Sequence, residues 1–411
     1  MMRTCSGRFR LLPAVLLSVV LSWFPAFGAE QAFMYGVDVV DSDTCRGLEG
    51  RKVGLITNMA GVTSSGEPNY LMMLRHGVDL RFLMAPEHGF HIDVAAGREV
   101  TDARLLDSLE VHSLYGKQRK PSRELLEKID VLVFDLQDIG TRCYTYISTM
   151  WYAMQAARET GTAFVVLDRP NPISPFRVDG FVTAPGFRSF VAAFDVPFLH
   201  GMTVGELALW LAEHHLPDLH LEVVRMTGYD RRMFADEIEG FRFYSPSPNI
   251  RDVETAVVYP ATVFLEATAI SEGRGTALPF KQFGAPFLDP EALISVLEQF
   301  QLQGVRWVPT SFRPASSKYA GELCRGVRIE ITSRSQFQPF RTGVALLVAL
   351  YQLYPQQLDL DSRGDFFDKL AGTALLRRMI TASSPFEEIV TAARCQAEAF
   401  DRRFPQRTVY P

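Results

Sequence analysis

Four long apolar runs in the first half of the chain each end in a polar tip. The runs are residues 53–58, 80–89, 131–138 and 164–172, and their tips carry Asn58, Glu87, Asp135, Asp138 and Asp168. Continuous Val, Leu, Ile and Phe runs are typical of strands that are buried on both faces, as in a parallel sheet. Because the carboxyl ends of such strands line the ligand crevice of an open α/β sheet, we expect the tips to meet at one rim. Tips this rich in carboxylates indicate a catalytic or polar-ligand site.

Helical patterns separate these runs, so strand and helix alternate along the chain. The predicted helices span residues 69–76, 122–128, 146–159 and 203–215, and a further strand is expected at 221–226. This alternation predicts an α/β fold with a Rossmann-like, doubly wound parallel sheet. Beyond the proline-rich residues 245–249 we expect helices at 290–300 and 343–353 and strands at 305–309 and 326–332. We therefore predict a Rossmann-like catalytic domain over residues 34–255 and a smaller α/β (α+β) C-terminal domain over residues 256–411.

The N-terminus reads as a targeting segment. Three arginines, at positions 3, 8 and 10, precede the apolar residues 11–24, and small residues follow at 26–28. This pattern predicts a signal peptide over residues 1–28, and hence a secreted or periplasmic protein without stable membrane insertion after cleavage. The alternative is an uncleaved membrane anchor, but Pro13, Pro25 and the short apolar core argue against it.

Composition and missing motifs narrow the class of protein. The 411 residues carry a formal net charge of −5, and no basic tract interleaved with aromatic residues is present, so we expect no nucleic-acid partner. No G-x-G-x-x-G fingerprint follows the first strand and no Walker motif occurs, so we expect no nucleotide, and we predict no cofactor. The spacing of the cysteines matches no metal motif and leaves both free thiols and disulfides open.

Glu87 is the first candidate for a catalytic acid. It lies between Pro86, which stiffens the exit from the strand, and Gly89, which permits a tight turn. A glutamic acid held there in a partly apolar pocket would have a raised pKa and could act as a general acid. The alternative is an ordinary glutamate that caps the next turn.

Other polar residues are candidates for the second catalytic role or for ligand binding. The further catalytic candidates are Asp135, Asp138 and Glu266. The candidates for binding are Asn58, His88, Arg142, Tyr144, Tyr146, Asp168, Arg169, His200, Glu272 and Arg274. The tyrosines offer stacking faces and hydroxyl donors, and the arginines and the helix start after His200 suit an anionic group. Structural roles stay open, since Arg169 could pair with Asp135 instead.

Several separate motifs occur in one order along the mature chain. They lie at residues 85–90 (APEHGF), 113–116 (SLYG), 134–140 (FDLQDIG), 144–147 (YTYI), 167–172 (LDRPNP), 200–207 (HGMTVGEL), 246–249 (PSPN) and 273–280 (GRGTALPF). In these the chain resembles the NamZ-type exo-β-N-acetylmuramidases, the family formerly called DUF1343, from about Gly36 to the C-terminus. The resemblance implies a Rossmann-like domain, a smaller C-terminal domain and an active-site cleft between them. It also implies release of N-acetylmuramic acid from the non-reducing ends of peptidoglycan fragments.

Hydrolysis of a glycosidic bond usually needs two carboxyl groups. We expect Glu87 to be the acid, and Asp135, Asp138 and Glu266 compete for the second role. A separation of about 5 Å would imply retention and about 6.5–9.5 Å inversion of configuration. In a third possibility the acetamido group of the substrate attacks, and a carboxylate only orients it.

Two other functions compete with this interpretation. One is a metal-dependent hydrolase, such as a deacetylase, that uses His88, Asp135 and Asp138, although their spacing matches no recognised zinc motif. The other is an exported sugar-binding protein that holds muropeptides without turnover. Two departures from the family pattern lie near the expected site, at His91 and at residues 267–269.

Overall fold

The computed structural model describes residues 32–105, 109–176, 178–405 and 407–411. Residues Ala32–Pro411 form one compact unit. The predicted signal peptide lies outside the described residues and stays a prediction. Over the part of the chain that is described, no helix combines the length and the apolar character that a bilayer crossing requires.

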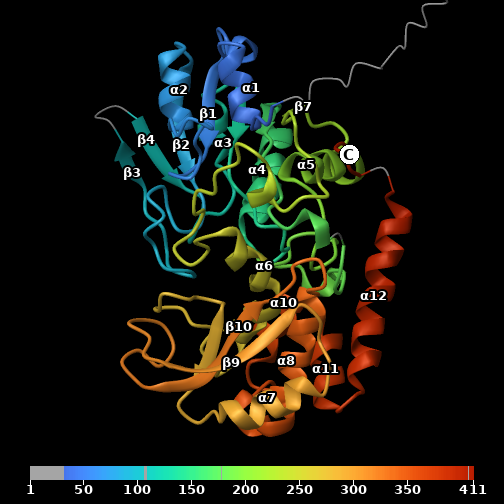
Figure 1. Cartoon of the computed structure of the whole chain (residues 1–411). Helices are drawn as coiled ribbons and strands as arrows, with labels where there is room; N and C mark the ends of the chain where they lie inside the picture. The colour runs from blue at the N-terminus through green and yellow to red at the C-terminus, as the bar shows by residue number, and fades with distance from the viewer. Residues whose placement is uncertain (1–31, 106–108, 177, 406) are drawn as a thin grey trace, which may run out of the picture. The chain divides into compact units, whose positions relative to one another are not determined.

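A seven-stranded sheet organises the first half of this unit (Figure 1). Six strands run parallel: β1 (Lys52–Ile56), β2 (Asp79–Ala85), β4 (Leu109–Ser113), β5 (Val131–Phe134), β6 (Ala163–Leu167) and β7 (Leu221–Val224). The short edge strand β3 (Ala103–Leu105) pairs antiparallel with β4. The order is β3-β4-β2-β1-β5-β6-β7, so the predicted doubly wound sheet is confirmed.

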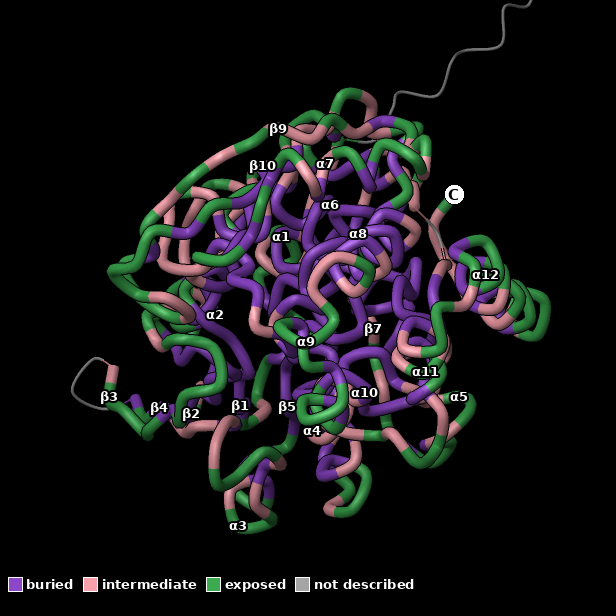
Figure 2. The backbone as a smooth tube through the Cα atoms, turned by 90° about the horizontal axis from the view of Figure 1, so that it is seen from below, coloured by how far each residue is buried: buried purple, intermediate pink, exposed green. Residues whose placement is uncertain are grey.

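Helices cover both faces of this sheet, which explains why its central strands are apolar throughout. The first face packs against α1 (Gly36–Ser42) and α2 (Asn69–Arg75). The second face packs against α3 (Arg123–Leu126), α4 (Tyr146–Thr160) and α5 (Val204–His215). Alternate residues of one strand enter different cores, since Val133 faces the first set of helices and Phe134 the second. The central strands are therefore buried along nearly their whole length (Figure 2).

The strand order reverses between β1 and β5, because β1 pairs with β2 on one side and with β5 on the other. Ligand sites of open α/β sheets lie outside the carboxyl ends of strands at such a switch point. Asn58 and Asp135 follow the two strands at this point, and Glu87 follows the neighbouring β2. The topology therefore brings these tips to one edge of the sheet.

A smaller second domain with an antiparallel sheet follows, as predicted. Its strands are β8 (Gln282–Ala285), β9 (Val305–Phe312) and β10 (Cys324–Ile331), in the order β8-β10-β9. Its helices are α7 (Pro290–Glu298), α8 (Pro339–Leu353), α9 (Pro355–Leu358), α10 (Gly364–Ala371), α11 (Leu375–Thr381) and α12 (Phe386–Arg403). Short 3-10 helices occur at Arg46–Leu48, Ser174–Phe176, Pro185–Phe187, Ala235–Glu237 and Val263–Ala267, the last called η5.

The two sheets share one hydrophobic core. A single buried cluster runs from α4 and α5 through α6 (Val253–Thr262) to α8. Helix α6 is almost entirely buried and contains Pro260 in its last turn. The predicted boundary near residue 255 falls inside this helix, and the domain limits stay a prediction. A shared core of this kind leaves little freedom for one sheet to move against the other.

The start of α5 is fixed by a reciprocal capping box. Thr203 Oγ1 accepts from the Glu206 amide at 3.1 Å, and the Glu206 carboxylate accepts from the Thr203 amide at 2.9 Å. The Thr203 hydroxyl also donates to Asp168 Oδ2 at 2.7 Å, which connects α5 to the end of β6. The helix start expected from the sequence is thus confirmed, with an added tertiary contact.

We expect Thr203→Ala to lower the free energy of unfolding by about 1–2 kcal/mol, because the N-cap acceptor is lost. Thr203→Ser should stay within about 0.5 kcal/mol of the wild type, since it keeps the hydroxyl. Urea denaturation followed by circular dichroism measures both values. Equal stability of the alanine and serine variants would contradict the capping role.

Candidate active site

A cavity of about 590 Å³ opens between the rim of the large sheet and the second domain. Its lining from the first half of the chain includes Glu87, His88, Arg98, Tyr115, Tyr144 and Thr145. Its lining from the second half includes Asn249, Tyr259, Glu266, Glu272, Arg274, Phe280 and Lys318. Carboxylates and cations therefore face one space from two parts of the chain.

Glu87 lies two residues beyond β2 and is only 6% exposed. Its Oε1 accepts from the Gly97 amide at 2.9 Å, and its Oε2 accepts from the Thr145 hydroxyl at 2.6 Å. Both donors are neutral, so no cation is bonded to this carboxylate among the described contacts. Burial and the nearby Glu87 charge raise the pKa of the Tyr115 hydroxyl. The carboxyl group is thus buried and held by a hydrogen bond on each oxygen.

Left-handed backbone conformations gather at this cavity. The φ angle is 72° at His88, 63° at Phe280 and 71° at Ser317. Such conformations are costly for residues other than glycine and persist where the surrounding structure holds them, often at functional sites. Burial lowers the pKa of the His88 imidazole, and its Nδ1 lies 2.8 Å from the Val94 carbonyl oxygen. A neutral ring that donates through Nδ1 leaves Nε2 as an acceptor.

The opposite wall is a network of ion pairs. Arg274 contacts Glu266 Oε1 at 2.5 Å through Nη2 and Glu272 Oε1 at 3.2 Å through Nε. Lys318 Nζ lies 3.1 Å from Glu272 Oε2 and donates to two backbone carbonyls as well. Burial raises the pKa of the Glu266 carboxyl, although Arg274 opposes this, and burial lowers the pKa of Lys318. Glu272 is bound on both oxygens, whereas Arg274 holds one oxygen of Glu266.

The structure separates the predicted site residues into two groups. Those that line the cavity are Glu87, His88, Tyr144, Glu266, Glu272 and Arg274. Those placed elsewhere in the buried interior are Asn58, Asp135, Asp138, Arg142, Tyr146, Asp168, Arg169 and His200. The catalytic and binding roles of all these residues stay predictions.

Asp135 and Arg169 form a buried bidentate ion pair. Arg169 Nε lies 2.5 Å from Asp135 Oδ1 and Nη2 lies 3.0 Å from Oδ2. The Asn69 amide donates to the same carboxylate at 2.7 Å. These contacts correspond to the structural alternative for Arg169, and they fix the end of β5 beneath the rim.

A second buried layer supports the cavity wall. Asp138 accepts from the Gly140 amide at 2.7 Å and lies 3.2 Å from His200 Nε2. Asn58 donates to the Tyr146 hydroxyl at 3.0 Å, and that hydroxyl lies 3.4 Å from the Glu87 carbonyl oxygen. The Tyr146 hydroxyl also donates to the Pro246 carbonyl oxygen, so it connects the segment after β2 with the segment before α6. His88, Asp135 and Asp138 have different partners, and the described residues contain no group of three or more potential metal ligands.

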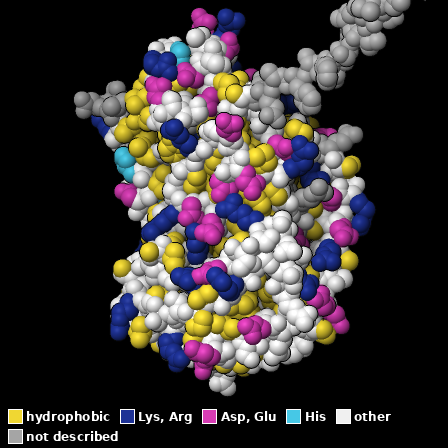
Figure 3. Space-filling model, viewed as in Figure 1, with side chains coloured by type: hydrophobic (Ala, Val, Ile, Leu, Met, Phe, Trp, Pro, Cys, Tyr) yellow, Lys and Arg dark blue, Asp and Glu magenta, His cyan; other side chains and the backbone are white. Residues whose placement is uncertain are grey.

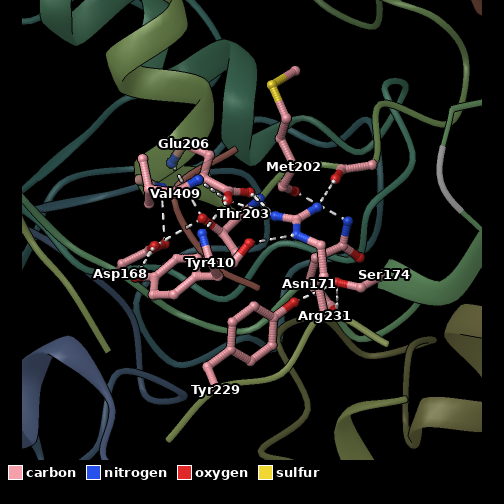
Figure 4. Close-up of polar contacts among 12 residues, drawn as sticks. Asp168, Asn171, Ser174, Met202, Thr203, Glu206, Tyr229, Arg231, Val409 and Tyr410 are labelled. Atoms are coloured by element: carbon pink, nitrogen blue, oxygen red, sulfur yellow. Dashed lines mark hydrogen bonds and ion pairs between the residues drawn. The ribbon is translucent and has the colours of Figure 1, made fainter. Parts of the chain in front are cut away.

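Asp168 anchors the C-terminal tail of the chain (Figure 4). Its Oδ2 accepts from the Tyr410 hydroxyl at 2.7 Å, and its Oδ1 accepts from the Gly205 amide at 2.8 Å. Glu206 accepts from the Val409 amide at 2.7 Å and pairs with Arg231. The tail therefore lies at the carboxyl end of β6. Helix α12 leads the chain from the second domain back to this end of the large sheet (Figure 1).

Arg142 is fully enclosed and connects distant segments. Its Nη1 donates to the carbonyls of Phe181 at 2.6 Å and Val196 at 3.0 Å, and its Nη2 donates to the carbonyl of Leu370 at 3.1 Å. Burial lowers the pKa of this guanidinium to about 10, so it is charged at neutral pH. Since Leu370 belongs to α10, Arg142 holds the loop after β5 against the second domain.

Sequence reasoning missed part of the lining. The missed residues are Arg98, Tyr115, Thr145, Asn249, Tyr259 and Lys318. Tyr115, Thr145 and Asn249 stand within motifs that the sequence analysis singled out, so those motifs were the available signal. Arg98 and Lys318 lie in loops without periodicity, and only the folded chain brings them to Glu87 and Glu272.

The fold is a two-domain α/β architecture whose cavity contains several carboxyl groups, the groups that glycosidases generally use. Models of the exo-β-N-acetylmuramidase NamZ match the chain, the N-terminal one at residues 53–254 and the C-terminal one at residues 257–410. The chain therefore belongs to the exo-β-N-acetylmuramidase NamZ family, as predicted, and is a glycosidase.

Similar proteins agree with this membership. The peptidoglycan β-N-acetylmuramidase NamZ of Bacillus subtilis (strain 168) is 40% identical over 379 residues, which cover 91% of each chain. A DUF1343 family protein from Bacteroides fragilis NCTC 9343 superimposes with a TM-score of 0.84 at 34% identity, covering 92% of this chain and 99% of that one. A second DUF1343 protein from the same strain gives a TM-score of 0.72 at 25% identity with the same coverage.

We expect Arg142→Met to lower the free energy of unfolding by about 3 kcal/mol or more, because three buried carbonyls lose their donor. Arg158→Met removes an arginine whose side chain is 42% exposed and should change stability by less than about 0.5 kcal/mol. Guanidinium denaturation of both variants measures the difference. Similar stability of the two would contradict a clamping role.

Asp168 should make stability depend on pH. Burial raises the pKa of this carboxyl to about 6, against an unfolded value near 4. Because the folded protein binds the proton more tightly, stability should fall as the pH rises from about 4 to about 6 and then level off. Asp168→Asn should lack this component, so its stability difference from the wild type should change over that window. The exposed control Asp218→Asn should give a constant difference, and a constant difference for Asp168→Asn would contradict the pKa assignment.

Proposed function

We propose that the protein is an exo-acting glycoside hydrolase that releases N-acetylmuramic acid from the non-reducing ends of peptidoglycan fragments. The observation that carries this proposal is a buried Glu87, held by neutral donors, that shares a cavity with Glu266. The curated relative at 40% identity has the printed name of a peptidoglycan β-N-acetylmuramidase. Fragments that contain N-acetylmuramic acid linked to N-acetylglucosamine would be its substrates.

Glu87 is suited to the role of general acid. Its carboxyl group lines the cavity and forms no ion pair with a described residue, so it can face the glycosidic oxygen of a bound sugar. In this role Glu87 protonates the glycosidic oxygen as the bond to the departing sugar breaks. Its two hydrogen bonds fix the carboxyl, so its orientation costs little in the transition state.

Glu266 is the favoured partner for the second role. Asp135 is engaged by Arg169 and Asp138 lies next to His200, and neither lines the cavity. Glu266 could act as base or nucleophile, or it could orient the acetamido group of the substrate so that this group attacks. Arg274 would stabilise the negative charge that Glu266 needs in each case.

The remaining lining suits an amino sugar. Tyr115 and Tyr144 offer aromatic faces against which the apolar face of a sugar ring can pack. The acceptor nitrogen of His88 and the amide of Asn249 offer hydrogen bonds to hydroxyl or acetamido groups. On the described part of the face in Figure 3, basic and acidic side chains are interspersed, which suits a small polar substrate better than a nucleic acid.

We also propose that the protein is exported by its N-terminal signal peptide. Residues 1–28 would direct the chain out of the cytoplasm and be removed, which would place the enzyme in the compartment that holds its substrate. The four cysteines of the described chain are free, so the fold needs no oxidative step.

Glu87→Gln should lower kcat on a MurNAc–GlcNAc disaccharide by about 10²–10⁴-fold, since the proton donor is lost and the side-chain shape is kept. The defect should be smaller on a nitrophenyl β-N-acetylmuraminide, because that leaving group needs little protonation. Steady-state assays of both substrates measure the difference. The control Glu110→Gln alters an exposed glutamate and should keep full activity.

The same assays decide the proposed function. Release from the muraminide and not from the matching N-acetylglucosaminide supports an exo-muramidase. A wild-type protein that binds the disaccharide without releasing either sugar would overturn hydrolysis and favour a binding protein. Equal defects of Glu87→Gln on good and poor leaving groups would remove Glu87 from the acid role.

A further inference from the structure

Three basic side chains line the cavity, and they differ in their partners. Arg274 is bound by Glu266 and Glu272, and Lys318 is bound by Glu272 and two backbone carbonyls. Arg98 has no ion pair and no side-chain hydrogen bond with any residue that the structure describes. Arg98 is therefore the lining cation that stays available to a ligand.

The backbone around Arg98 is fixed directly on the catalytic wall. The amide of the preceding Gly97 donates to Glu87 Oε1 at 2.9 Å, and the Arg98 amide donates to the Ala95 carbonyl at 3.1 Å. The same loop is tied to His88, since the Val94 amide donates to the His88 carbonyl at 3.2 Å. The main chain is thus held, while Arg98 is exposed and lines the same cavity as Glu87.

The ion pairs of the cavity show which of its charged side chains are already neutralised by a partner. Glu266 and Glu272 are offset by Arg274 and Lys318, whereas Glu87 has neutral donors only. A substrate carboxylate that enters this cavity loses water and needs a cation that is not already paired with an acidic side chain. A guanidinium offers two parallel N–H groups that match a carboxylate in geometry and charge.

We propose that Arg98 binds the lactyl carboxylate of the substrate and so determines the specificity for N-acetylmuramic over N-acetylglucosamine units. This inference rests on the proposed function. The sequence analysis offered other residues for an anionic group. Of these, Arg142, Arg169 and His200 are enclosed away from the cavity, and Arg274 is held by two glutamates. Arg98 acts on binding and has no part in the proton transfer.

The test compares two substrates that differ only in charge. A nitrophenyl β-N-acetylmuraminide with a free lactyl carboxylate is assayed beside its lactyl carboxamide, at low and at high salt. Arg98→Ala should raise KM for the free acid by about 10- to 100-fold, as expected for the loss of a charge-assisted bond, and should hardly change KM for the carboxamide. Arg98→Lys should recover part of the affinity. Added salt should raise KM of the wild type for the acid only.

Lys117→Ala is the matched control, because it removes one positive charge from a side chain that is 90% exposed and does not line the cavity. It should leave the preference for the free acid unchanged. Equal losses of Arg98→Ala on both substrates, or loss of the preference in Lys117→Ala, would overturn the assignment of Arg98. A wild-type enzyme that releases nitrophenol from neither muraminide would overturn the proposed function, and this inference with it.

Discussion

Burial of carboxylates at the carboxyl edge of one parallel sheet is the constraint on which the rest of this structure depends. A parallel sheet places the ends of its strands together, and this chain ends several of them in acids. A buried carboxylate needs hydrogen-bond donors or a cation. Asp135 is bound by Arg169, and Asp168 is bound by the start of α5 and by the C-terminal tail. Glu87 differs from both because it faces a cavity.

The same constraint explains what the sequence could predict. The apolar runs and their polar tips predicted β1, β2, β5 and β6, their parallel direction and the edge where the tips meet, because burial is a local property of the pattern. The pattern could not separate a structural from a catalytic acid. That distinction depends on partners far away in the chain, such as Tyr410 for Asp168 and the carbonyl of Leu370 for Arg142.

Elements with weak local signals were missed for a similar reason. Helix α6 contains a proline and is buried at every position except Glu254, so it lacks the polar face by which a helix is recognised in a sequence. It is stable because both halves of the chain pack around it in one core. Arg98 and Lys318 could not be recognised as site residues from the sequence, because their neighbours in the chain form no recognisable motif. Only the folded loops bring them to the cavity. The part of the site that local sequence patterns do not predict is therefore formed by tertiary packing.

The two departures from the expected family pattern, at His91 and at residues 267–269, differ in their position relative to Glu266. The His91 side chain is exposed, packs its ring edge-on against Phe90 and does not line the cavity. Ala267 is buried directly after Glu266 in η5, and Thr268 ends this turn by donating to the Leu265 carbonyl at 2.8 Å. Residue 267 belongs to the 3-10 helix that carries Glu266, whereas residue 91 lies on the exposed side of a loop. Residues 267–269 therefore bear on the position of the Glu266 carboxylate, whereas His91 lies outside the lining of the cavity.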